Sequence, residues 1–386
     1  MKALHLSHHF WPCIGGVEKV IENICINAEK HGIESTILCL NKCPKGKEKL
    51  KKEEKFEKLK KIKIQRIPFI DLKYYKIAPH ALFYPKKEFD LIHVHGLGFF
   101  SDLMLLTKFL HRKPVIVSTY GSIFHTKKFL LLKKIYFNLI QRALLSFADK
   151  VIVISKADET KAKEIISTPD YAPIGAELKK MKKEEIEKMK KQKNSFVFVG
   201  RYSKNKRIEL LIEKFTGIIK EKKDAKLFII GKDFDELKKE FEKKISEAHA
   251  QKNIFLTENL SDKEIEQKYA KCEFFVSASE YESFGISAVE AMNYGLIPIL
   301  NDIPAFREFI EGEKKESKKN KEKLNGFIVD FESKNAEKKI IEIMDLNENE
   351  KKMISLNAHK KAQEYSWNEK IKKYIEIYEE TGKESE

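Results

Sequence analysis

The sequence predicts an α/β protein made of two doubly wound domains, each a parallel sheet with helices on both faces. Its 386 residues exceed the roughly 250 to 300 at which a single hydrophobic core stops growing. Short apolar runs rich in Val, Ile and Phe alternate with amphipathic helical patterns, as in parallel α/β sheets. The alternation stops in a Lys- and Glu-rich stretch after residue 175 and then starts again. These observations predict two separate sheets in one chain.

The first domain is predicted over residues 1–175 and begins with a strand at 3–7. A helix with regularly spaced apolar residues follows at 17–31, and then a strand at 36–40. A strand, a helix and a strand within ~40 residues predict a βαβ unit with a right-handed connection. Further strands are expected at 64–68, 91–95, 115–119 and 151–154.

The second domain is predicted over residues 176–364, where strands and helices alternate again. Strands are expected at 196–199, 227–230, 254–256, 274–277 and 297–300, with helices near 207–222, 235–249, 261–270 and 284–294. Ligands of doubly wound sheets bind at the carboxyl ends of the strands. We therefore expect the two domains to face a cleft that holds the ligand.

The last segment, 365–386, is predicted to form a helix on the outside that returns to the first domain. Its apolar residues recur at helical spacing, and no strand pattern follows them. They are Trp367, Ile371, Tyr374, Ile375 and Tyr378.

The net charge of +16, from 75 Lys and Arg against 59 Asp and Glu, raises three candidate partners: nucleic acid, an anionic membrane surface and anionic small molecules. Much of the charge is Lys mixed with Glu, which is typical of solvated helices. A basic nucleic-acid-binding protein remains the alternative function, but the sequence has no aromatic platform or binding motif for it. We therefore expect no nucleic-acid partner.

The five cysteines form no C-x-x-C pair, and their number is odd. In a chain of this length they are expected to be reduced thiols without a metal. The N-terminus has no signal-peptide pattern, and no run of ~18 apolar residues occurs. The protein is therefore expected in the cytoplasm.

The stretch from Glu280 to Gly295, EYESFGISAVEAMNYG, combines two carboxylates with a predicted helix start. The first N–H groups of a helix lack partners within it and can bind an anion, and Gly285 allows close approach. Glu282 precedes the helix and Glu290 lies inside it, so both carboxylates can accept hydrogen bonds from the hydroxyls of one ligand. Alternatively, both are surface residues, because negative charge is favourable near a helix N-terminus.

A second motif, GRYSKNK at 200–206, lies between a predicted strand and a predicted helix. Arg201 can bind a diphosphate with two hydrogen bonds, and Lys206 can act as a point charge. The alternative is an ordinary surface loop, since nearly every loop of this chain contains lysine.

The first strand is followed by PCIGG at 12–16, whose adjacent glycines can bring backbone N–H groups close to a phosphate or a sugar. A plain tight turn is the alternative. The motif differs from the dinucleotide fingerprint G-x-G-x-x-G, which argues against an NAD-dependent oxidoreductase.

The D-x-D motif at Asp233 and Asp235 can hold a divalent metal against a diphosphate. Because it lies between a strand and a helix, we interpret it as a helix cap. No metal site and no cofactor are predicted.

Several polar residues end strands of the first sheet. His93 and His95 end one predicted strand, and Tyr120 and His125 follow the next one. A residue in these places can orient a hydroxyl or a phosphate, although a structural histidine is commoner. Tyr120 and His125 are the candidate site residues of this group.

Residues 125–147 combine apolar runs with charges that are all basic. Such a helix can lie on an anionic bilayer surface. Burial against the first sheet explains the apolar residues equally well.

Together these stretches resemble the retaining glycosyltransferases of family 4, which have the two-domain GT-B fold. FWPCIGGVEKVIENICINAEKHG resembles the family's Gly-Gly loop and first helix, and FDLIHVHG and ADKVIVIS resemble its inner strands. FVGRYSKNKRIELLIEKF resembles its G-R-x-x-x-x-K segment, and YSWNEKIKKYIEIYEE resembles its closing helix. The most specific likeness is Glu282-x7-Glu290. The resemblance covers nearly the whole chain.

The resemblance implies a nucleotide-diphosphate sugar donor. Arg201 and Lys206 would bind its diphosphate, Glu290 its ribose and Glu282 a hydroxyl of the transferred sugar. The remaining donor contacts would come from the backbone of Gly16, Phe284, Gly285 and Ile286. Where related sequences often read S-T-H-G, this one reads Ser118-Thr119-Tyr120-Gly121. The family's catalytic histidine is thus replaced by Tyr120 or by His125.

The implied function is the transfer of a hexose- or heptose-type sugar, with retention and without a metal, to a glycan or lipid-linked acceptor. The acceptor would bind to the first domain and the donor to the second. Surface polysaccharide or lipopolysaccharide synthesis, at the inner face of the plasma membrane, would be the setting. A non-catalytic relative that has kept the fold is a further alternative.

Overall fold

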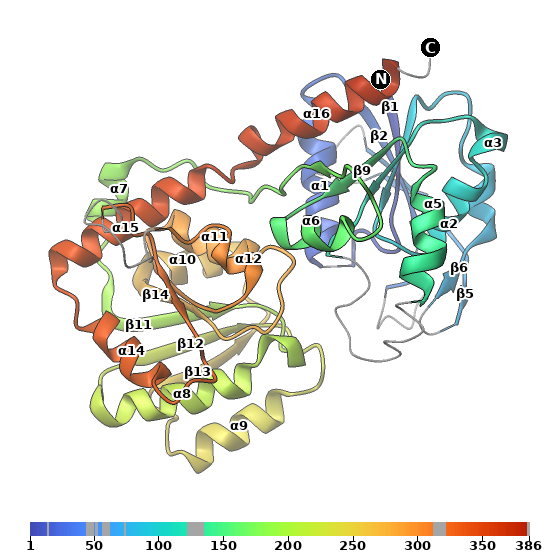
Figure 1. The fold of residues 1–386 in the computed structure, drawn as a ribbon. Coiled ribbons are helices and arrows are strands. Elements are labelled where there is room, and N and C mark those ends of the chain that lie inside the picture. The colour runs from blue at the N-terminus through green and yellow to red at the C-terminus, as the bar shows by residue number, and fades with distance from the viewer. Residues whose placement is uncertain are drawn as a thin grey trace. The chain divides into compact units, whose positions relative to one another are not determined.

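The computed structural model describes residues 1–13, 15–43, 50, 53–55, 62–72, 75–121, 135–311 and 322–383 (Figure 1). The chain divides into two compact units. Unit 1 comprises Met1–Gly175 and Trp367–Glu386, and unit 2 comprises Ala176–Ser366. Each has its own sheet and its own hydrophobic core. The predicted class, an α/β protein with two doubly wound domains, is confirmed.

The main sheet of unit 1 has the strand order β10-β9-β8-β7-β1-β2-β4-β3. All neighbouring strands are parallel except β3 and β4. A separate hairpin pairs β5 with β6. The strands are β1 (Lys2–Leu6), β2 (Glu34–Leu40), β3 (Glu53–Lys55), β4 (Lys63–Ile67), β5 (Ile70–Asp71), β6 (Lys76–Ile77), β7 (Leu91–His95), β8 (Val115–Ser118), β9 (Lys150–Val153) and β10 (Asp170–Tyr171).

Helices pack against the main sheet of unit 1, and its last helix comes from the C-terminus of the chain. α16 packs against α1, and the Tyr374 hydroxyl of α16 donates to the carbonyl of Ala172 at 3.0 Å. The helices are α1 (Gly16–Glu29), η1 (Pro79–Phe83), α2 (Phe99–Leu106), α3 (Lys108–His111), the π-helix η2 (Tyr136–Gln141), α5 (Arg142–Leu145), α6 (Lys156–Ala162) and α16 (Trp367–Lys383).

The sheet of unit 2 has the order β13-β12-β11-β14-β15-β16, and all of its strands are parallel. The strands are β11 (Gln192–Val199), β12 (Lys226–Gly231), β13 (Ile254–Glu258), β14 (Cys272–Ser277), β15 (Ile297–Asn301) and β16 (Phe327–Val329). The helices are α7 (Lys183–Lys188), η3 (Lys204–Lys206), α8 (Ile208–Glu221), α9 (Lys238–Glu247), α10 (Asp262–Lys271), α11 (Ile286–Asn293), α12 (Pro304–Arg307), α14 (Ala336–Met344) and α15 (Glu348–Gln363). Every residue of β15 is buried, as expected of a parallel sheet covered on both faces.

Each sheet has one point where the direction of strand addition reverses. In unit 1 it lies between β1 and β7, and in unit 2 between β11 and β14. In open α/β sheets ligands bind outside the carboxyl ends of the strands at such a switch point. A ligand site is therefore expected at the switch point of each unit.

The expectation of reduced thiols is wrong for two of the five cysteines. Cys13, in the loop after β1, forms a disulfide with Cys43, in the loop after β2, and their Cα atoms are 5.5 Å apart. Cys25, Cys39 and Cys272 are free and buried, as expected. Parallel neighbouring strands end at the same edge of the sheet, which brings together two cysteines that are 30 residues apart in sequence.

In the described part of the chain, no helix is both long enough and apolar enough to cross a membrane.

Candidate active site

The loops that follow β11 and β14 meet at the switch point of unit 2. The N–H of Glu280 donates to the carbonyl of Asn205 at 3.0 Å, and the Asn205 side chain donates to the carbonyl of Tyr281 at 3.2 Å. The first loop ends with Lys206 and the second contains Glu282. Backbone hydrogen bonds thus hold a predicted cation and a predicted carboxylate at the same edge of the sheet.

Lys206 and Glu282 form a close ion pair. Lys206 Nζ lies 2.5 Å from Glu282 Oε1 and 2.6 Å from Oε2, and the Ser279 hydroxyl donates to Oε1 at 3.0 Å. Only 13% of the Lys206 side chain and 15% of the Glu282 side chain are exposed. A ligand with an anionic group for Lys206 and hydroxyls for Glu282 can replace this pair with equivalent interactions.

Arg201 lies in the same loop as Lys206 but is exposed. Its Cζ is 4.8 Å from the centre of the Phe234 ring, a distance typical of a cation–π contact. The following residue, Tyr202, is fully buried, and its hydroxyl lies 3.0 Å from the carbonyl oxygens of Ile229 and Thr257. This anchor fixes the backbone next to Arg201, while the guanidinium remains accessible.

Two glycines let neighbouring segments approach each other closely at this edge of the unit 2 sheet. A Cβ at Gly231 would lie 1.8 Å from the carbonyl oxygen of Gly200, so β12 and the loop after β11 require glycine there. Gly285 has φ 103°, and a Cβ on it would lie 2.8 Å from the Phe306 ring. Phe284 is 1% exposed and packs in the core. A ligand at the start of α11 would therefore contact its backbone and not the Phe284 ring.

The start of α11 contains the other predicted donor contacts. Ile286 is its first residue, and Glu290 lies one turn further on and is half-buried. Burial raises the pKa of Tyr269 well above its usual range, and the charge of Glu290 raises it further. Burial raises the pKa of Tyr294, and the charges of Glu266 and Glu290 raise it further. Glu290 therefore lies within electrostatic reach of both tyrosines.

Asp233 binds the first N–H groups of α9, although the N-cap residue is Leu237 and neither predicted aspartate. Its Oδ1 accepts from the N–H of Leu237 at 2.9 Å, and its Oδ2 accepts from the N–H of Lys238 at 3.1 Å. Asp235 accepts instead from the N–H of Lys204 at 3.0 Å. The second aspartate thus stabilises the loop that contains Arg201 and Lys206.

The predicted residues of unit 1 have different environments. Gly16 is the first residue of α1, next to its N-cap Gly15. A Cβ on Gly16 would meet nothing within 4 Å, whereas one on Gly15 would overlap the Glu18 carboxylate. Because the Glu18 carboxylate is the end of a flexible side chain and Gly15 has an extended backbone, this turn requires neither glycine. His125 lies outside the described residues.

The Tyr120 side chain points into a buried polar network. Tyr120 has φ 51°, and its hydroxyl is 2.8 Å from His95 Nδ1. Burial raises the pKa of Tyr120 well above its usual range. The Tyr120 hydroxyl thus binds His95. A ligand at this turn would contact the backbone of Tyr120 and not its hydroxyl.

Sequence reasoning identified His93 and His95 as strand-end residues but not the buried cluster that they form with His5. His5 Nδ1 is 3.0 Å from His95 Nε2, and His93 bonds to the Tyr378 hydroxyl at 2.6 Å and to the Ser118 hydroxyl at 2.8 Å. Burial lowers the pKa of His5 to about 3 and those of His93 and His95 well below their usual range. His5 and His93 are register partners, so the alternation of side chains along β1 and β7 could have revealed that they share a face.

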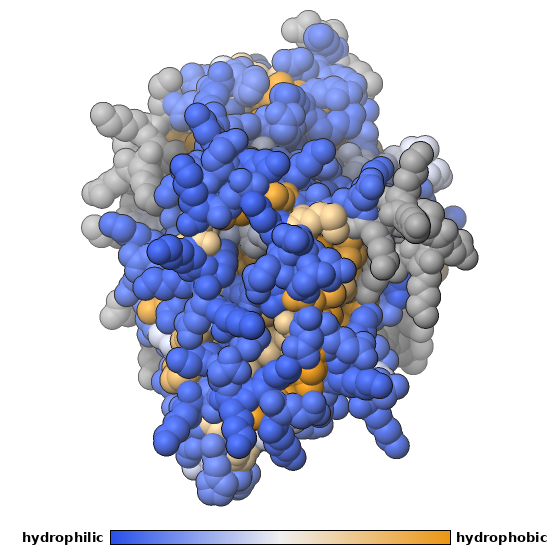
Figure 2. Space-filling model, turned by 90° about the vertical axis from the view of Figure 1, so that its left-hand side faces the viewer, coloured by the Kyte–Doolittle hydropathy of each residue, from blue (hydrophilic) through white to orange (hydrophobic). Residues whose placement is uncertain are grey.

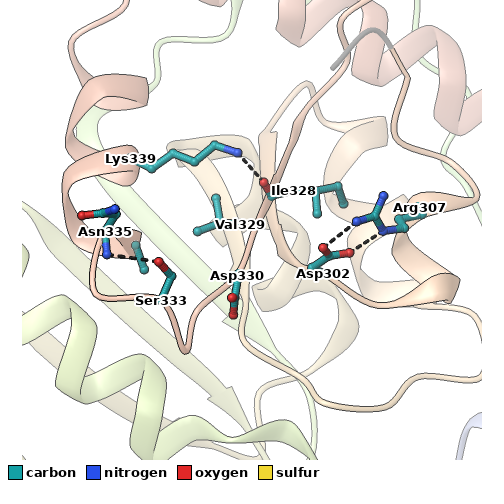
Figure 3. Close-up of a pocket in the computed structure, with 9 residues that line it drawn as sticks. Asp302, Arg307, Ile328, Val329, Asp330, Ser333, Asn335 and Lys339 are labelled. Carbon is teal, nitrogen blue, oxygen red and sulfur yellow. Dashed lines mark hydrogen bonds and ion pairs between the residues drawn. The ribbon is translucent and has the colours of Figure 1, made fainter. Parts of the chain in front are cut away.

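A cavity of about 470 Å³ lies elsewhere at the carboxyl edge of the unit 2 sheet, next to β15 and β16 (Figure 3). Arg307 binds Asp302 through Nε and Nη2, and Lys339 donates to the carbonyl of Ile328 at 2.6 Å. None of the predicted donor-binding residues lines it. It is lined by Asp302, Arg307, Ile328, Val329, Asp330, Ser333, Asn335, Ala336 and Lys339. The loops after β11 and β14, which hold the predicted residues at the switch point, therefore remain the candidate site.

Two families match the sequence and together span both units. Residues 14–169 match Glycosyltransferase Family 4, and residues 179–361 match Glycosyl transferases group 1.

The chain is also similar to enzymes named GDP-mannose:cellobiosyl-diphosphopolyprenol alpha-mannosyltransferase. The enzyme of Xanthomonas oryzae pv. oryzae (strain PXO99A) is 31% identical over 313 residues, which cover 79% of this chain and 80% of that enzyme. The enzyme of Komagataeibacter xylinus is 26% identical over 312 residues, which cover 81% of this chain and 78% of that enzyme.

Solved structures share the fold over the whole chain. Sucrose-phosphate synthase from Thermosynechococcus elongatus has a TM-score of 0.74 at 16% identity and covers 98% of both chains. HepE from Anabaena, in complex with UDP and glucose, has a TM-score of 0.72 at 18% identity, and the match covers 98% of this chain and 99% of HepE. The family matches and the similar mannosyltransferases favour an enzyme over a nucleic-acid-binding protein. The chain belongs to glycosyltransferase family 4 and is a glycosyltransferase with the GT-B fold.

Proposed function

We propose that the protein is a retaining mannosyltransferase, which moves mannose from GDP-mannose to a polyprenol-diphosphate-linked oligosaccharide in surface polysaccharide synthesis. The relatives named for this reaction align with about four fifths of the chain. The structural observation that carries the proposal is the Lys206–Glu282 pair at the switch point of unit 2. It combines a cation for a diphosphate with a carboxylate for sugar hydroxyls.

The donor is assigned to unit 2 and the acceptor to unit 1. Lys206 and Arg201 bind the diphosphate, Glu282 accepts a hydrogen bond from a hydroxyl of the transferred sugar, and Glu290 accepts one from the ribose. Backbone groups supply further donor contacts at Phe284, Gly285 and Ile286. Support comes from the loop geometry, because hydrogen bonds between the loops hold Lys206 and Glu282 at one edge.

Donor binding exchanges one set of polar contacts for another. Without donor, the charges of Lys206 and Glu282 neutralise each other at 2.5 Å. With donor, the ammonium turns to the phosphate oxygens and the carboxylate to the sugar hydroxyls. Both groups are mostly buried, so each must keep a partner throughout. A ligand that supplies only the diphosphate or only the sugar leaves one of them unpaired, which favours the complete donor.

The cations stabilise the departing diphosphate. As the bond between the sugar and the phosphate breaks, negative charge grows on the phosphate oxygens that face Lys206, Arg201 and the start of α11. In a retaining reaction the acceptor hydroxyl attacks from the same face. A departing phosphate oxygen takes its proton as the new glycosidic bond forms. These fixed charges supply the stabilisation that a divalent metal would otherwise provide, so chelation by EDTA is expected to leave activity unchanged.

An apolar patch on unit 1 supports attachment to the inner face of the plasma membrane. Seven large side chains of neighbouring elements are 47% to 74% exposed: Leu106, Phe109, Leu110, Ile135, Leu139, Ile140 and Phe147. The described residues between 91 and 148 include four Lys or Arg and one Asp. Exposed apolar groups among cations suit an anionic bilayer surface. In contrast, hydrophilic residues cover most of the face in Figure 2, with hydrophobic residues in small areas.

The test is a transfer assay with the full-length protein. Radiolabelled GDP-mannose, UDP-glucose and ADP-glucose are each incubated with lipid-linked oligosaccharides extracted from bacterial membranes. Label is expected to enter the lipid fraction from GDP-mannose and to be released by an α-mannosidase. Transfer from another donor only would refute the proposed donor, and a β-linked product would refute retention.

A further inference from the structure

The loop after β12 lies against the loop after β11, which contains Arg201. Beyond the ends of the two strands the chains continue side by side, because Tyr202 forms an isolated parallel bridge with Asp233. The N–H of Tyr202 donates to the carbonyl of Lys232 at 2.8 Å, and the N–H of Phe234 donates to the carbonyl of Tyr202 at 3.1 Å. Backbone hydrogen bonds therefore fix Phe234 beside the residue that follows Arg201.

The Phe234 ring contacts the Arg201 side chain without neutralising its charge. The guanidinium lies over the ring, with Cζ 4.8 Å from the ring centre. A ring attracts a cation through its quadrupole but has no oxygen atom to accept the N–H hydrogen bonds, as a carboxylate does. No hydrogen bond or ion pair to this guanidinium occurs among the residues that the structure describes. The charge and the N–H donors of Arg201 therefore remain available for an anion.

Lys206, the other cation of this loop, differs in this respect. Its ammonium lies 2.5 Å and 2.6 Å from the two carboxylate oxygens of Glu282, and its side chain is mostly buried. Arg201 is exposed. Of the two predicted diphosphate ligands, Arg201 is thus the one that can bind a phosphate without first leaving another anion.

The contact with Phe234 also lowers the entropic cost of using Arg201. An exposed arginine has many rotamers, and fixing its side chain on binding lowers the affinity. Phe234 is half-buried, and the following residue, Asp235, accepts from the N–H of Lys204 at 3.0 Å. The ring therefore belongs to a loop that is fixed on both sides. It restricts the Arg201 side chain before a ligand arrives.

We propose that Phe234 is a positioning residue of the donor site, whose ring holds the Arg201 guanidinium where it binds the diphosphate of the nucleotide. This inference rests on the proposed function, which assigns the diphosphate to Arg201 and Lys206. It gives the two cations different tasks. Arg201 binds the diphosphate of a nucleotide with or without a sugar, whereas Lys206 leaves Glu282 only when the complete donor supplies hydroxyls for that carboxylate.

Isothermal titration calorimetry on the full-length protein tests the assignment, with GDP as probe. Phe234→Leu keeps an apolar side chain but loses the π-face, and it is expected to weaken GDP binding about 5- to 10-fold. Phe234→Tyr, which keeps the ring, should bind GDP like the wild type. Phe228→Leu is the matched control, because Phe228 is a half-buried residue of β12 whose ring centre lies 4.0 Å from the Nζ of Lys268. This control removes a contact of the same kind from another cation and should leave GDP binding unchanged.

A double-mutant cycle separates a positioning role from a merely structural one. Arg201→Ala should weaken GDP binding more than Phe234→Leu does. In the Arg201→Ala background, Phe234→Leu should have no further effect, because the side chain that the ring positions is gone. If Phe234 only stabilised the two loops, its loss would weaken GDP binding by the same factor with or without Arg201. Circular dichroism spectra and melting temperatures show whether each variant is folded.

Steady-state kinetics with GDP-mannose provide a second reading. Phe234→Leu should raise KM about as much as it weakens GDP binding and change kcat less than about 2-fold, because the bound diphosphate itself orients Arg201. Lys206→Ala, in contrast, should act mainly on kcat. The proposal is overturned if Phe234→Leu binds GDP like the wild type, if Phe234→Tyr loses as much affinity as Phe234→Leu, or if the effects of Phe234→Leu and Arg201→Ala are additive.

The titrations also distinguish failure of this inference from failure of the proposed function. UDP and ADP are titrated in the same way, because each carries the diphosphate assigned to Arg201. If one of them binds and GDP does not, the proposed donor is wrong, and the titrations with that nucleotide still decide the role of Phe234. If the wild type transfers mannose but Phe234→Leu has no effect, only the positioning role is wrong. A wild type that binds none of the three nucleotides would overturn both.

Discussion

The two units share a fold but differ in the chemistry of their surfaces. All twelve large hydrophobic side chains found exposed in the described part of the chain belong to unit 1. Nine of the eleven histidines and the disulfide belong to it too. Unit 2 has a continuous core of aliphatic and aromatic residues. Under the proposed function, unit 2 holds the donor, and the exposed apolar side chains of unit 1 would face an amphiphilic acceptor and a lipid surface.

The cores of the units differ in the same way. One face of the unit 1 sheet buries His5, His93 and His95. In unit 2 a buried ion pair, Lys351 to Glu273 at 2.9 Å, lies beside stacked aromatic rings. A histidine network loses its neutral state in acid, while the aliphatic and aromatic side chains that make up most of the unit 2 core do not titrate. The stability of unit 1 should therefore depend more on solution conditions.

The largest effect is expected from Lys206→Ala in unit 2. It should lower kcat about 10²- to 10³-fold, the usual result of removing one group that stabilises developing charge. The melting temperature should also fall, because the mostly buried Glu282 carboxylate then keeps, among the described residues, only the Ser279 hydroxyl as a partner, so turnover is measured well below the melting temperature of the variant. Steady-state kinetics give the answer, with Lys204→Ala as control, since Lys204 is an exposed residue of the same turn. Near-normal turnover in Lys206→Ala would remove its role.

Reduction of the Cys13–Cys43 disulfide should destabilise unit 1 selectively. The disulfide closes a loop of 30 residues. The chain-entropy relation gives it a contribution of about 3.5 kcal/mol to the free energy of unfolding. Urea unfolding with and without dithiothreitol measures this difference. The Cys13→Ser/Cys43→Ser double variant should equal the reduced protein and show no response to dithiothreitol. An unchanged unfolding curve on reduction would mean that no disulfide forms.

Acid should destabilise unit 1 before unit 2. The pKa of His5 falls from 6.5 to about 3 on folding because of burial, so the unfolded chain binds more protons between these values. The full contribution of His5 to the free energy of unfolding is present above pH 6.5. It decreases as the pH falls and is smaller by about 3 kcal/mol at pH 4. Hydrogen exchange at pH 7 and pH 4.5 can follow each unit separately. Equal loss of protection in both units would contradict the comparison.

The smallest effect is expected from the apolar patch. Phe109→Ser together with Leu139→Ser should weaken binding to phosphatidylglycerol vesicles about 10-fold, by removing apolar area that enters the interface. Lys243→Ser in unit 2 is the control. Vesicle sedimentation measures the bound fraction. Undiminished binding of the double variant would show that this patch does not contact the membrane.

Much of the fold could be predicted because its periodicities are strong. The helices predicted at 207–222 and 261–270 are α8 and α10. The helix predicted at 284–294 starts two residues later, because Gly285 has a positive φ that a helix cannot contain. The limits of helices were thus harder to predict than their existence.

The parts of the sites that depend on contacts between distant segments could not be predicted. Cys13 and Cys43 follow the two strands of the predicted βαβ unit, but the unit does not determine which residues of the two loops meet. Arg201 and Phe234 lie in different loops, and the sequence does not show that their side chains meet. Lys206 and Glu282 were recognised because each lies beside a strand end in a motif that resembles the family.

The return of α16 to unit 1 has a consequence for synthesis in the cell. The ribosome completes Met1–Gly175 first, but Tyr378, which bonds to His93 in the centre of the sheet, belongs to the last segment. About 190 residues of unit 2 are made in between, which takes about 10 to 40 seconds at common rates of translation. During this interval the face of α1 that packs against α16 is uncovered. The nascent first unit is therefore expected to bind chaperones, and a chain truncated before Trp367 should be degraded although both sheets are complete.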